Sequence, residues 1–289
     1  MVITLTLTHL PDIPVEAETI TPSDFVGKSM SAIGKLPIHQ GNKSLSLDEF
    51  FEIDGTPGST VEDMEILLVG DLRRVKMIGR RMNGGYVTIR GSAGMYLGAE
   101  MVAGRIHVTG SVGSWTAAEM QGGNIQIEGD AGDYLCSGYR GSPDGMKGGR
   151  VYVVGNVGRD MASHMRRGFI AVKGNVGENA AARMKGGSIV ILGDVGGRMG
   201  VQATRGMIFV AGQLESMFPT YRFSGVARRP LVDYYLHYVL GRRPDFFQDR
   251  DIFDAKWLKF VGDFAESNPR EELYLQEATN HEFVQEVEE

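Results

Sequence analysis

The side chains best suited to chemistry are scattered along this chain of 289 residues. Its six histidines share no spacing typical of a metal site, and they are His9, His39, His107, His164, His237 and His281. The single cysteine, Cys136, has no second cysteine to pair with and stands inside a repeated stretch, where a small packed residue is commoner than a nucleophile. No Ser, His and Asp are arranged around a nucleophile elbow. The sequence therefore predicts neither a catalytic residue nor a metal ligand in this chain.

Glycine punctuates the stretch around Cys136 at a regular period. The chain has 40 glycines, about twice the usual share. Eight of them follow an apolar segment at steps of 19 residues, apart from one step of 21 and one of 26, and they are Gly70, Gly91, Gly110, Gly129, Gly155, Gly174, Gly193 and Gly212. Because disorder keeps no period, these glycines indicate a stacked repeat.

Three further columns run in the same register. A second glycine column follows three residues after the first, from Gly94 to Gly196. Pairs of β-branched residues recur from Val87 and Ile89 to Ile208 and Val210. The last column is methionine, at Met82, Met101, Met120, Met146, Met165 and Met184. Four columns that share one register cannot arise by chance.

The repeat unit contains short β-branched strands and leaves no room for a helix. A leucine-rich repeat is excluded, because its regular leucine ladder and asparagine column are absent. The sequence predicts a mainly β fold, a right-handed parallel β-helix of about seven to eight 19-residue coils over residues 66–214. We expect coils ~4.8 Å apart, glycines that turn corners with positive φ, and methionines that fill the centre of each coil.

The residues on either side of the repeat follow other patterns. Residues 1–65 predict a small α/β cap with strands at 2–8, 15–19 and 44–53 and a helix that starts at Thr21. A cap is expected there because an open coil exposes unpaired strand edges. Residues 215–289 predict a C-terminal extension with a helix over 231–241, a strand near 256–263 and a loose acidic tail from Asn280.

Composition excludes several classes of function. The net charge of −6 does not suggest nucleic-acid binding. No apolar run approaches the roughly 18–20 residues of a membrane helix, and the first residues alternate as a strand does rather than as a signal peptide. The mixed, charged sequence without a disulfide framework indicates a cytoplasmic protein. Residues 70–212 hold 18 Lys and Arg against 10 Asp and Glu, whereas the flanks hold 12 and 26.

An insertion of seven residues interrupts the fourth coil and is a candidate binding loop. It falls within residues 133–145, and insertions in stacked repeats form loops that are often binding faces. Basic residues after the methionine column would stack at about 4.8 Å, where like charges repel by about 1 kcal/mol even in water. We expect carboxylates from the acidic flanks or from a partner to neutralise this basic ladder, unless its side chains splay into solvent. The predicted contact residues are Tyr139, Arg140, Asp144, Lys147, Arg166, Arg167, Arg183 and Lys185.

A second candidate surface is an apolar stripe on the outward side of the later coils. Early coils carry polar residues there, such as Thr88, His107 and Gln126. An apolar stripe is not expected to face water. It therefore predicts an interface, either with the helix over 231–240 of the same chain or with another protein chain. Its members are Tyr152, Val154, Val190, Leu192 and Phe209.

Several segments resemble a known family. The glycine repeat looks like the β-helix domain at the C-terminus of the glutamate synthase large subunit. Over nearly its whole length the chain is more similar to the C subunit of formylmethanofuran dehydrogenase and of the formyltransferase/hydrolase complex. The segments that carry the resemblance are residues 70–79, Gly113-Ser114-Trp115, Tyr139-Arg140-Gly141, residues 221–225 and residues 256–263.

The resemblance implies a complex that handles formyl groups on a methanofuran- or methylofuran-type carrier with a polyglutamate tail, which the basic residues would also suit. It implies three partners, one hydrolase-like, one molybdopterin-oxidoreductase-like and one a formyltransferase. Metal and molybdopterin would then belong to these partners, and this chain would be a non-catalytic scaffold.

Two alternatives stay open beside that hypothesis. The first is the C subunit of a molybdenum or tungsten formylmethanofuran dehydrogenase, although 21 Arg against 9 Lys and the lack of a cysteine cluster favour the formyltransferase/hydrolase. The second is a stand-alone β-helix acyltransferase. It is less favoured because the period is 19 residues and no column carries a histidine.

Overall fold

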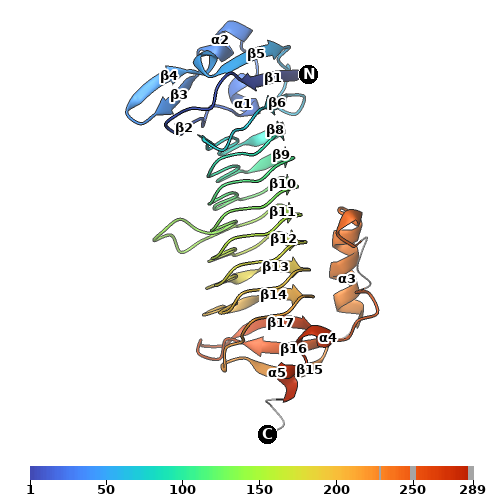
Figure 1. Cartoon of the computed structure of the whole chain (residues 1–289). Helices are drawn as coiled ribbons and strands as arrows, with labels where there is room; N and C mark the ends of the chain where they lie inside the picture. Colours follow the sequence, from blue (N-terminus) through green and yellow to red (C-terminus); the bar gives the residue numbers. More distant parts are fainter. Residues whose placement is uncertain (228, 248–251, 286–289) are drawn as a thin grey trace.

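The structure is a computed structural model that describes residues 1–227, 229–247 and 252–285, most of them in strands and turns (Figure 1). One sheet has 13 strands in the order β15-β16-β17-β14-β13-β12-β11-β10-β9-β8-β6-β1-β5, and a second sheet has the order β4-β3-β2-β7. Most neighbours in the large sheet are parallel. The prediction of a mainly β, β-helix-like fold is therefore confirmed.

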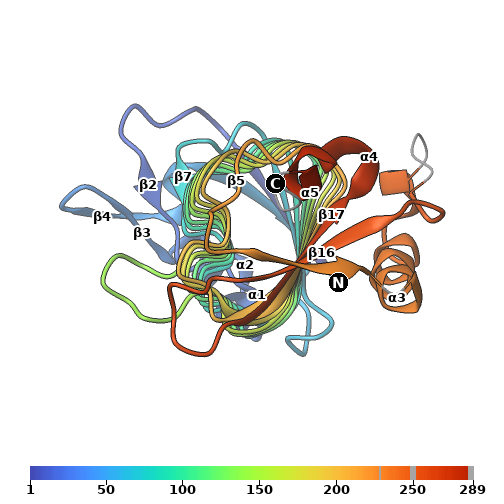
Figure 2. The same cartoon turned by 90° about the horizontal axis from the view of Figure 1, so that it is seen from below.

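Successive copies of the repeat stack on one another in the main sheet. Their strands are β6 (Glu65–Val69), β8 (Asn83–Arg90), β9 (Ala103–Val108), β10 (Asn124–Ile127), β11 (Arg150–Val153), β12 (Phe169–Val172), β13 (Lys185–Ile191) and β14 (Arg205–Val210). Equivalent residues pair, so that Ile125 lies between Ile106 and Val151. A second line of parallel bridges runs from Leu72 to Leu214. Viewed along the stack, the coils superpose (Figure 2), so each repeat is one coil.

The glycines of the first column allow neighbouring coils to approach each other closely, and most of them do not form corners of the chain. Only Gly70 and Gly91 of this column have positive φ. A Cβ on Gly174 would lie 2.4 Å from the carbonyl oxygen of Gly155 in the preceding coil. The prediction that these glycines turn corners with positive φ is therefore wrong for most of the column, because the neighbouring backbone is what excludes a side chain there.

Other residue types hold the left-handed positions of the coil. In one coil they are Trp115, Ala117 and Glu119, all with positive φ. The N–H groups of Trp115 and Glu119 donate to carbonyls of the next coil, and that of Ala117 donates to the carbonyl of Leu97 in the previous coil at 2.8 Å. This alternating bonding holds conformations that are costly for a residue with a Cβ.

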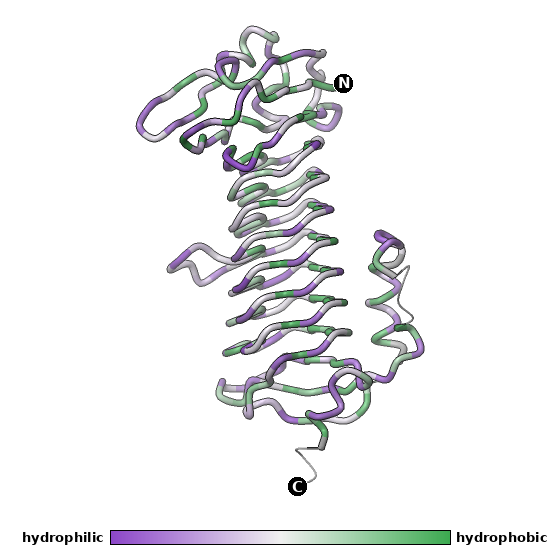
Figure 3. The backbone as a smooth tube through the Cα atoms, viewed as in Figure 1, coloured by the Kyte–Doolittle hydropathy of each residue, from purple (hydrophilic) through white to green (hydrophobic). Residues whose placement is uncertain are grey.

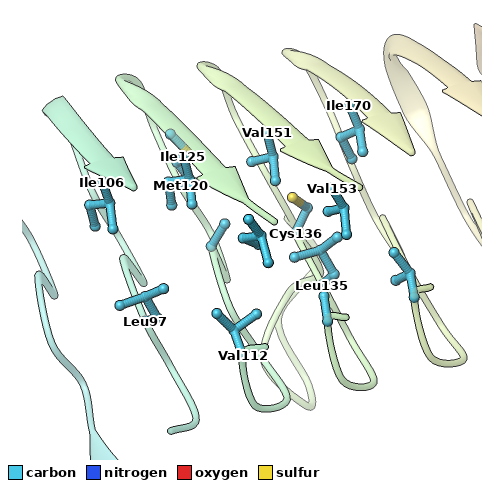
Figure 4. Packing of buried hydrophobic residues seen from close by; sticks show 14 of the residues in the cluster. Leu97, Ile106, Val112, Met120, Ile125, Leu135, Cys136, Val151, Val153 and Ile170 are labelled. Carbon is cyan, nitrogen blue, oxygen red and sulfur yellow. The ribbon is translucent and has the colours of Figure 1, made fainter. Parts of the chain in front are cut away.

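Methionine and β-branched side chains fill the interior of the stack (Figure 4). Met101, Met120 and Met165 are fully buried. A Cβ on Gly187, in the coil after Met165, would lie 2.6 Å from the Met165 methyl carbon. The methionine column therefore packs against a glycine at the start of the next strand, and the prediction that methionine fills the coil centre is confirmed.

The N-terminal segment closes the first coil. It contains β1 (Val2–Leu7), β2 (Val15–Glu16), α1 (Pro22–Phe25), α2 (Met30–Gly34), β3 (Pro37–Gln40), β4 (Lys43–Ser46), the 3-10 turn η1 (Leu47–Glu49) and β5 (Phe51–Gly55), with β7 (Val75–Lys76) joining the small sheet. Thr21 caps α1, as predicted. The predicted strand at 44–53 is instead two strands, because a capping box between Ser46 and Glu49 forms the turn between them. β1 pairs with β6 in parallel and with β5 antiparallel, which covers the end of the stack.

The C-terminal segment closes the last coil and returns along its side. It contains β15 (Arg222–Val226), α3 (Arg229–Leu240), η2 (Pro244–Phe247), β16 (Trp257–Gly262), β17 (Arg270–Gln276), α4 (Glu277–Asn280) and α5 (Glu282–Gln285). β17 extends the stack in parallel with β14, and β16 and β15 follow antiparallel. α3 lies beside the coils, as both views show (Figures 1 and 2).

The beginning of the predicted loose tail is packed. Asn280 is fully buried. Its side-chain oxygen accepts from the N–H of Leu214 at 2.8 Å, and its side-chain nitrogen donates to the carbonyl of Gly212 at 2.9 Å. The prediction was wrong here because this residue satisfies backbone groups at the end of the last coil. Residues 286–289 of the predicted tail lie outside the described residues.

Candidate functional site

The cysteine lies in the coil interior rather than at a reactive surface. Cys136 is fully buried among the side chains of the stack (Figure 4). It occupies the same left-handed position in its coil as Ala117 and Ala162. Burial raises the pKa of its thiol, which disfavours the thiolate. Among the described residues, no three His, Cys, Asp or Glu side chains gather as metal ligands would. Across the same ranges, no helix combines the length and apolar character needed to cross a bilayer.

The insertion leaves the coil only after residue 138. The N–H of Cys136 donates to the carbonyl of Thr116 at 2.9 Å, so this part still follows the coil. Met146 returns to the stack, where its N–H donates to the carbonyl of Cys136 at 3.0 Å. The residues between form a loop that projects from the stack (Figure 1) and is largely hydrophilic (Figure 3). The extra residues are therefore 139–145, a narrower range than the predicted 133–145.

The insertion loop fastens several coils together. The hydroxyl of Tyr139 donates to Glu100 at 3.2 Å, two coils towards the N-terminus. Burial, with the nearby Glu100 carboxylate, raises the pKa of Tyr139, so the hydroxyl stays protonated and able to donate. In the opposite direction, Asp144 forms an ion pair with Arg166, and the Lys185 ammonium donates to the carbonyl of Pro143 at 3.1 Å. The loop thus contacts coils on both sides of its own.

The basic ladder is partly neutralised within the β-helix itself. Lys147 lies 3.9 Å from a Glu119 oxygen, and Arg166 pairs with Asp144. These carboxylates belong to the coils and the insertion, a source that the sequence did not suggest. Arg183 donates to the Gln202 amide oxygen at 2.9 Å instead of to a carboxylate. Arg140 and Arg167 are exposed, which leaves positive charge on this face.

Three aromatic side chains stack on the same corner of the coils. Tyr96, Trp115 and Tyr134 occupy the equivalent left-handed position in successive coils. The ring centroids of Trp115 and Tyr134 are 4.3 Å apart, and those of Tyr96 and Trp115 are 5.7 Å apart. The Arg140 guanidinium lies 6.0 Å from the Trp115 ring. Sequence reasoning missed this column, although its position two residues after the second glycine column would have revealed it.

The apolar stripe is buried by the chain's own C-terminal segment. Tyr152, Val190, Leu192 and Phe209 are at most 1% exposed, and Val154 is partly buried. The side chains that pack on them come from α3, η2 and the strands that follow, and they include Val232, Leu236, Val239, Phe246 and Trp257. The intramolecular explanation of the stripe therefore applies, and these residues do not offer a free surface to another protein chain.

A buried arginine anchors the end of α3 to the coils. The side chain of Arg243 is 7% exposed and lies 2.7 Å from both Glu128 and Asp245. Its hydrogen bond lowers the pKa of Asp245, which keeps that carboxylate ionised. Glu128 also lies 3.0 Å from the His107 ring nitrogen. No local sequence pattern around Arg243 predicts this network, because Arg243 and Glu128 are 115 residues apart in the chain.

A second buried polar group lies at the C-terminal end of the stack. Glu271 is fully buried, and burial raises its pKa well above the usual range. The Tyr221 hydroxyl lies 2.6 Å from one Glu271 oxygen and 3.0 Å from the carbonyl of Gly200. A hydroxyl donates only one hydrogen bond. Both contacts are satisfied when Glu271 is protonated, donates to Tyr221, and Tyr221 donates to Gly200.

No family model matches the chain. Comparison with individual known proteins does identify relatives. A stretch of 86 residues is 48% identical to the C subunit of molybdenum-containing formylmethanofuran dehydrogenase 1 from Methanosarcina barkeri, covering 30% of this chain and 29% of that protein. A stretch of 97 residues is 40% identical to the C subunit of tungsten-containing formylmethanofuran dehydrogenase 2 from Methanothermobacter wolfeii, covering 34% of this chain and 36% of that protein. These matches span about a third of the relatives' own length.

A solved structure matches over almost the whole chain. It is a chain of the formyltransferase/hydrolase complex of Methylorubrum extorquens, crystallised with methylofuran, with a TM-score of 0.83 and 27% identity over 94% of this chain and 99% of that chain. The stacked repeat and this match define a β-helix-like protein, and the chains that it resembles are parts of larger assemblies. Within that class, the chain is related to the C subunits of formylmethanofuran dehydrogenases and to a chain of the formyltransferase/hydrolase complex.

Proposed function

We propose that this chain is a non-catalytic scaffold within a formyltransferase/hydrolase complex that handles formyl groups on a methanofuran- or methylofuran-type carrier. The observation that carries the proposal is the match over 94% of this chain and 99% of a chain from such a complex. The burial of Cys136, the one cysteine, agrees with a packing role for that residue.

The proposal assigns the chemistry to the partners of this chain. One partner is hydrolase-like, one is molybdopterin-oxidoreductase-like and one is a formyltransferase, and metal or molybdopterin belongs to them. This chain supplies a right-handed β-helix of about seven to eight coils in residues 66–214, between an N-terminal cap of residues 1–65 and a C-terminal extension of residues 215–289. The proposed location of the complex is the cytoplasm.

The insertion loop and the basic ladder form the proposed contact with a partner or with a polyglutamate tail. Support comes from the projection of the loop (Figure 1) and from the exposed side chains of Arg140 and Arg167. Arg140 is exposed beside Trp115, whereas Arg166 and Lys185 hold the loop in place. The residues assigned to this contact are Tyr139, Arg140, Asp144, Lys147, Arg166, Arg167, Arg183 and Lys185.

A second candidate function is that of the C subunit in a molybdenum or tungsten formylmethanofuran dehydrogenase. The specific observation in its favour is the 48% identity to such a protein, although that identity covers only 86 residues. A stand-alone acyltransferase has less support, because each of these relatives is named as one part of a complex or is a chain within one.

Purification of the chain from its natural host, through an affinity tag, tests these functions together. We expect mass spectrometry to find three further subunits and the assembly to release formate from the formylated furan carrier. Molybdenum or tungsten in the assembly, with formyl oxidation coupled to an electron acceptor, would favour the dehydrogenase. Formyl transfer or hydrolysis by the isolated chain would contradict the scaffold role.

A further inference from the structure

The outer face of the main sheet is covered in one half and open in the other. α3 packs over β11 to β14, where the outward residues are apolar. Over β8 to β10 the outward residues are polar and are exposed or partly exposed. In parallel register they form two rows, Tyr86, Arg105 and Asn124 in one and Thr88, His107 and Gln126 in the other.

This open half contains a hollow of about 220 Å³, lined by both rows. Tyr86, one of the residues that line it, is 43% exposed. The Arg105 guanidinium lies 5.8 Å from the Tyr86 ring. An exposed aromatic ring beside an arginine is the combination found at the energetic centre of protein interfaces.

Arg105 gives the hollow positive charge, and no Asp or Glu is among the residues that line it. Of the nearby carboxylates, Glu65 accepts from Thr88 at 3.2 Å and Glu128 is held between His107 and Arg243. Glu62 lines an adjoining hollow that shares Arg105. Arg105 has no carboxylate within ion-pair distance among the described residues. A hollow with a guanidinium and without a lining carboxylate suits a ligand that supplies acceptors and negative charge.

We propose that the open half of this face binds an acidic segment of another protein of the complex, which places a carboxylate beside the Arg105 guanidinium and extends over the sheet the cover that α3 provides. The inference rests on the proposed function, since it requires an assembly. An acidic partner is inferred because its charge complements that of this surface. The binding place is inferred because the hollow lies directly beyond Arg243, the residue that anchors the end of α3. The C-terminal segment of this chain covers the apolar stripe, whereas a partner covers this polar half of the face.

Charge reversal in the purified assembly tests the proposal. Arg105→Glu should lower the recovery of the other proteins of the complex by about tenfold or more, because like charges brought together at an interface are strongly unfavourable. The thermal midpoint of the isolated variant should equal that of the parent chain. The matched control is Arg205→Glu, an exposed arginine of β14 in the same sheet, which should retain the partners. Equal recovery with Arg105→Glu and with the parent chain would overturn the proposal.

The outcome separates this inference from the proposed function. If the parent chain itself brings down no partner, the proposed function fails. If it does and Arg105→Glu does too, only the docking surface fails.

A photo-cross-linking residue in place of Tyr86 identifies the occupant directly. We expect a cross-link, within the intact assembly, to a segment of a different protein chain that contains Asp or Glu. A cross-link to a second copy of this chain, to a segment without carboxylates, or to nothing in an assembled complex would each refute the assignment.

Discussion

Glu271→Gln should remove a pH dependence from the stability of this protein. The buried carboxyl keeps its proton in the folded chain, while in the unfolded chain it titrates near 4.5. Above that pH the unfolded chain binds fewer protons than the folded chain, so the free energy of unfolding falls as pH rises towards the folded pKa. Glutamine does not titrate, yet its amide nitrogen can donate to Tyr221, which keeps the hydrogen bond from Tyr221 to Gly200.

The expected size follows from proton linkage. One bound proton changes the free energy of unfolding by about 1.4 kcal/mol per pH unit. The stability of Glu271→Gln relative to the parent chain should therefore rise by about 1.4 kcal/mol for each pH unit between the unfolded and the folded pKa.

Urea unfolding at pH 5, 6 and 7 measures this difference. The control is Glu272→Gln, the next residue of β17, whose carboxylate lies 2.5 Å from the Lys259 ammonium. Although burial opposes it, hydrogen bonds from Lys259 and Tyr274 lower the pKa of Glu272. Ionised Glu272 therefore stabilises the folded chain above pH 4.5, and this contribution is lost as the pH falls further. The difference in free energy of unfolding between Glu272→Gln and the parent chain should stay constant from pH 5 to 7. If the difference in free energy of unfolding between Glu271→Gln and the parent chain is equally constant over this range, Glu271 is not protonated in the folded chain and the reasoning is refuted.

Three further changes test the packing and the surface. Met165→Ala empties a fully buried site of the stack and should lower the free energy of unfolding by about 2–5 kcal/mol in urea titration; a loss below about 1 kcal/mol would contradict the account of the core. Phe209→Ala should cost about 3–5 kcal/mol and expose α3 to limited proteolysis; an unchanged digestion pattern would argue against the covering role of α3. Changing Lys147, Arg166 and Lys185 together to Gln should free the insertion loop for proteolysis and weaken assembly at low salt; unchanged assembly and digestion would leave only a solvated basic face.

The register of the coils could be predicted because equivalent residues meet the same neighbours in every copy. Ile106, Ile125 and Val151 show one β-branched column in the sequence and one ladder in the sheet. The glycine columns were equally visible, but their cause was not. A sequence records that a Cβ is missing at Gly174, and only the structure tells that the carbonyl of Gly155 excludes it.

Contacts between distant segments could not be predicted in the same way. Arg243 binds Glu128 across the chain, and neither residue belongs to a local pattern that requires the other. Asn280 reads as part of an acidic tail, because the sequence does not show that it closes the backbone of the last coil. The hollow beside Tyr86 likewise depends on where α3 stops.

The insertion loop and α3 give the stack a property that a simple repeat lacks. In an array where each coil touches only its neighbours, stability is a sum of adjacent terms and the ends fray independently. Here Tyr139 reaches Glu100 at a separation of 39 residues, Lys185 reaches Pro143 at 42, and Arg243 reaches Glu128 at 115. These longer ties couple coils that do not touch, so the middle of the stack should open in one cooperative step, with uniform protection of its amides from hydrogen exchange.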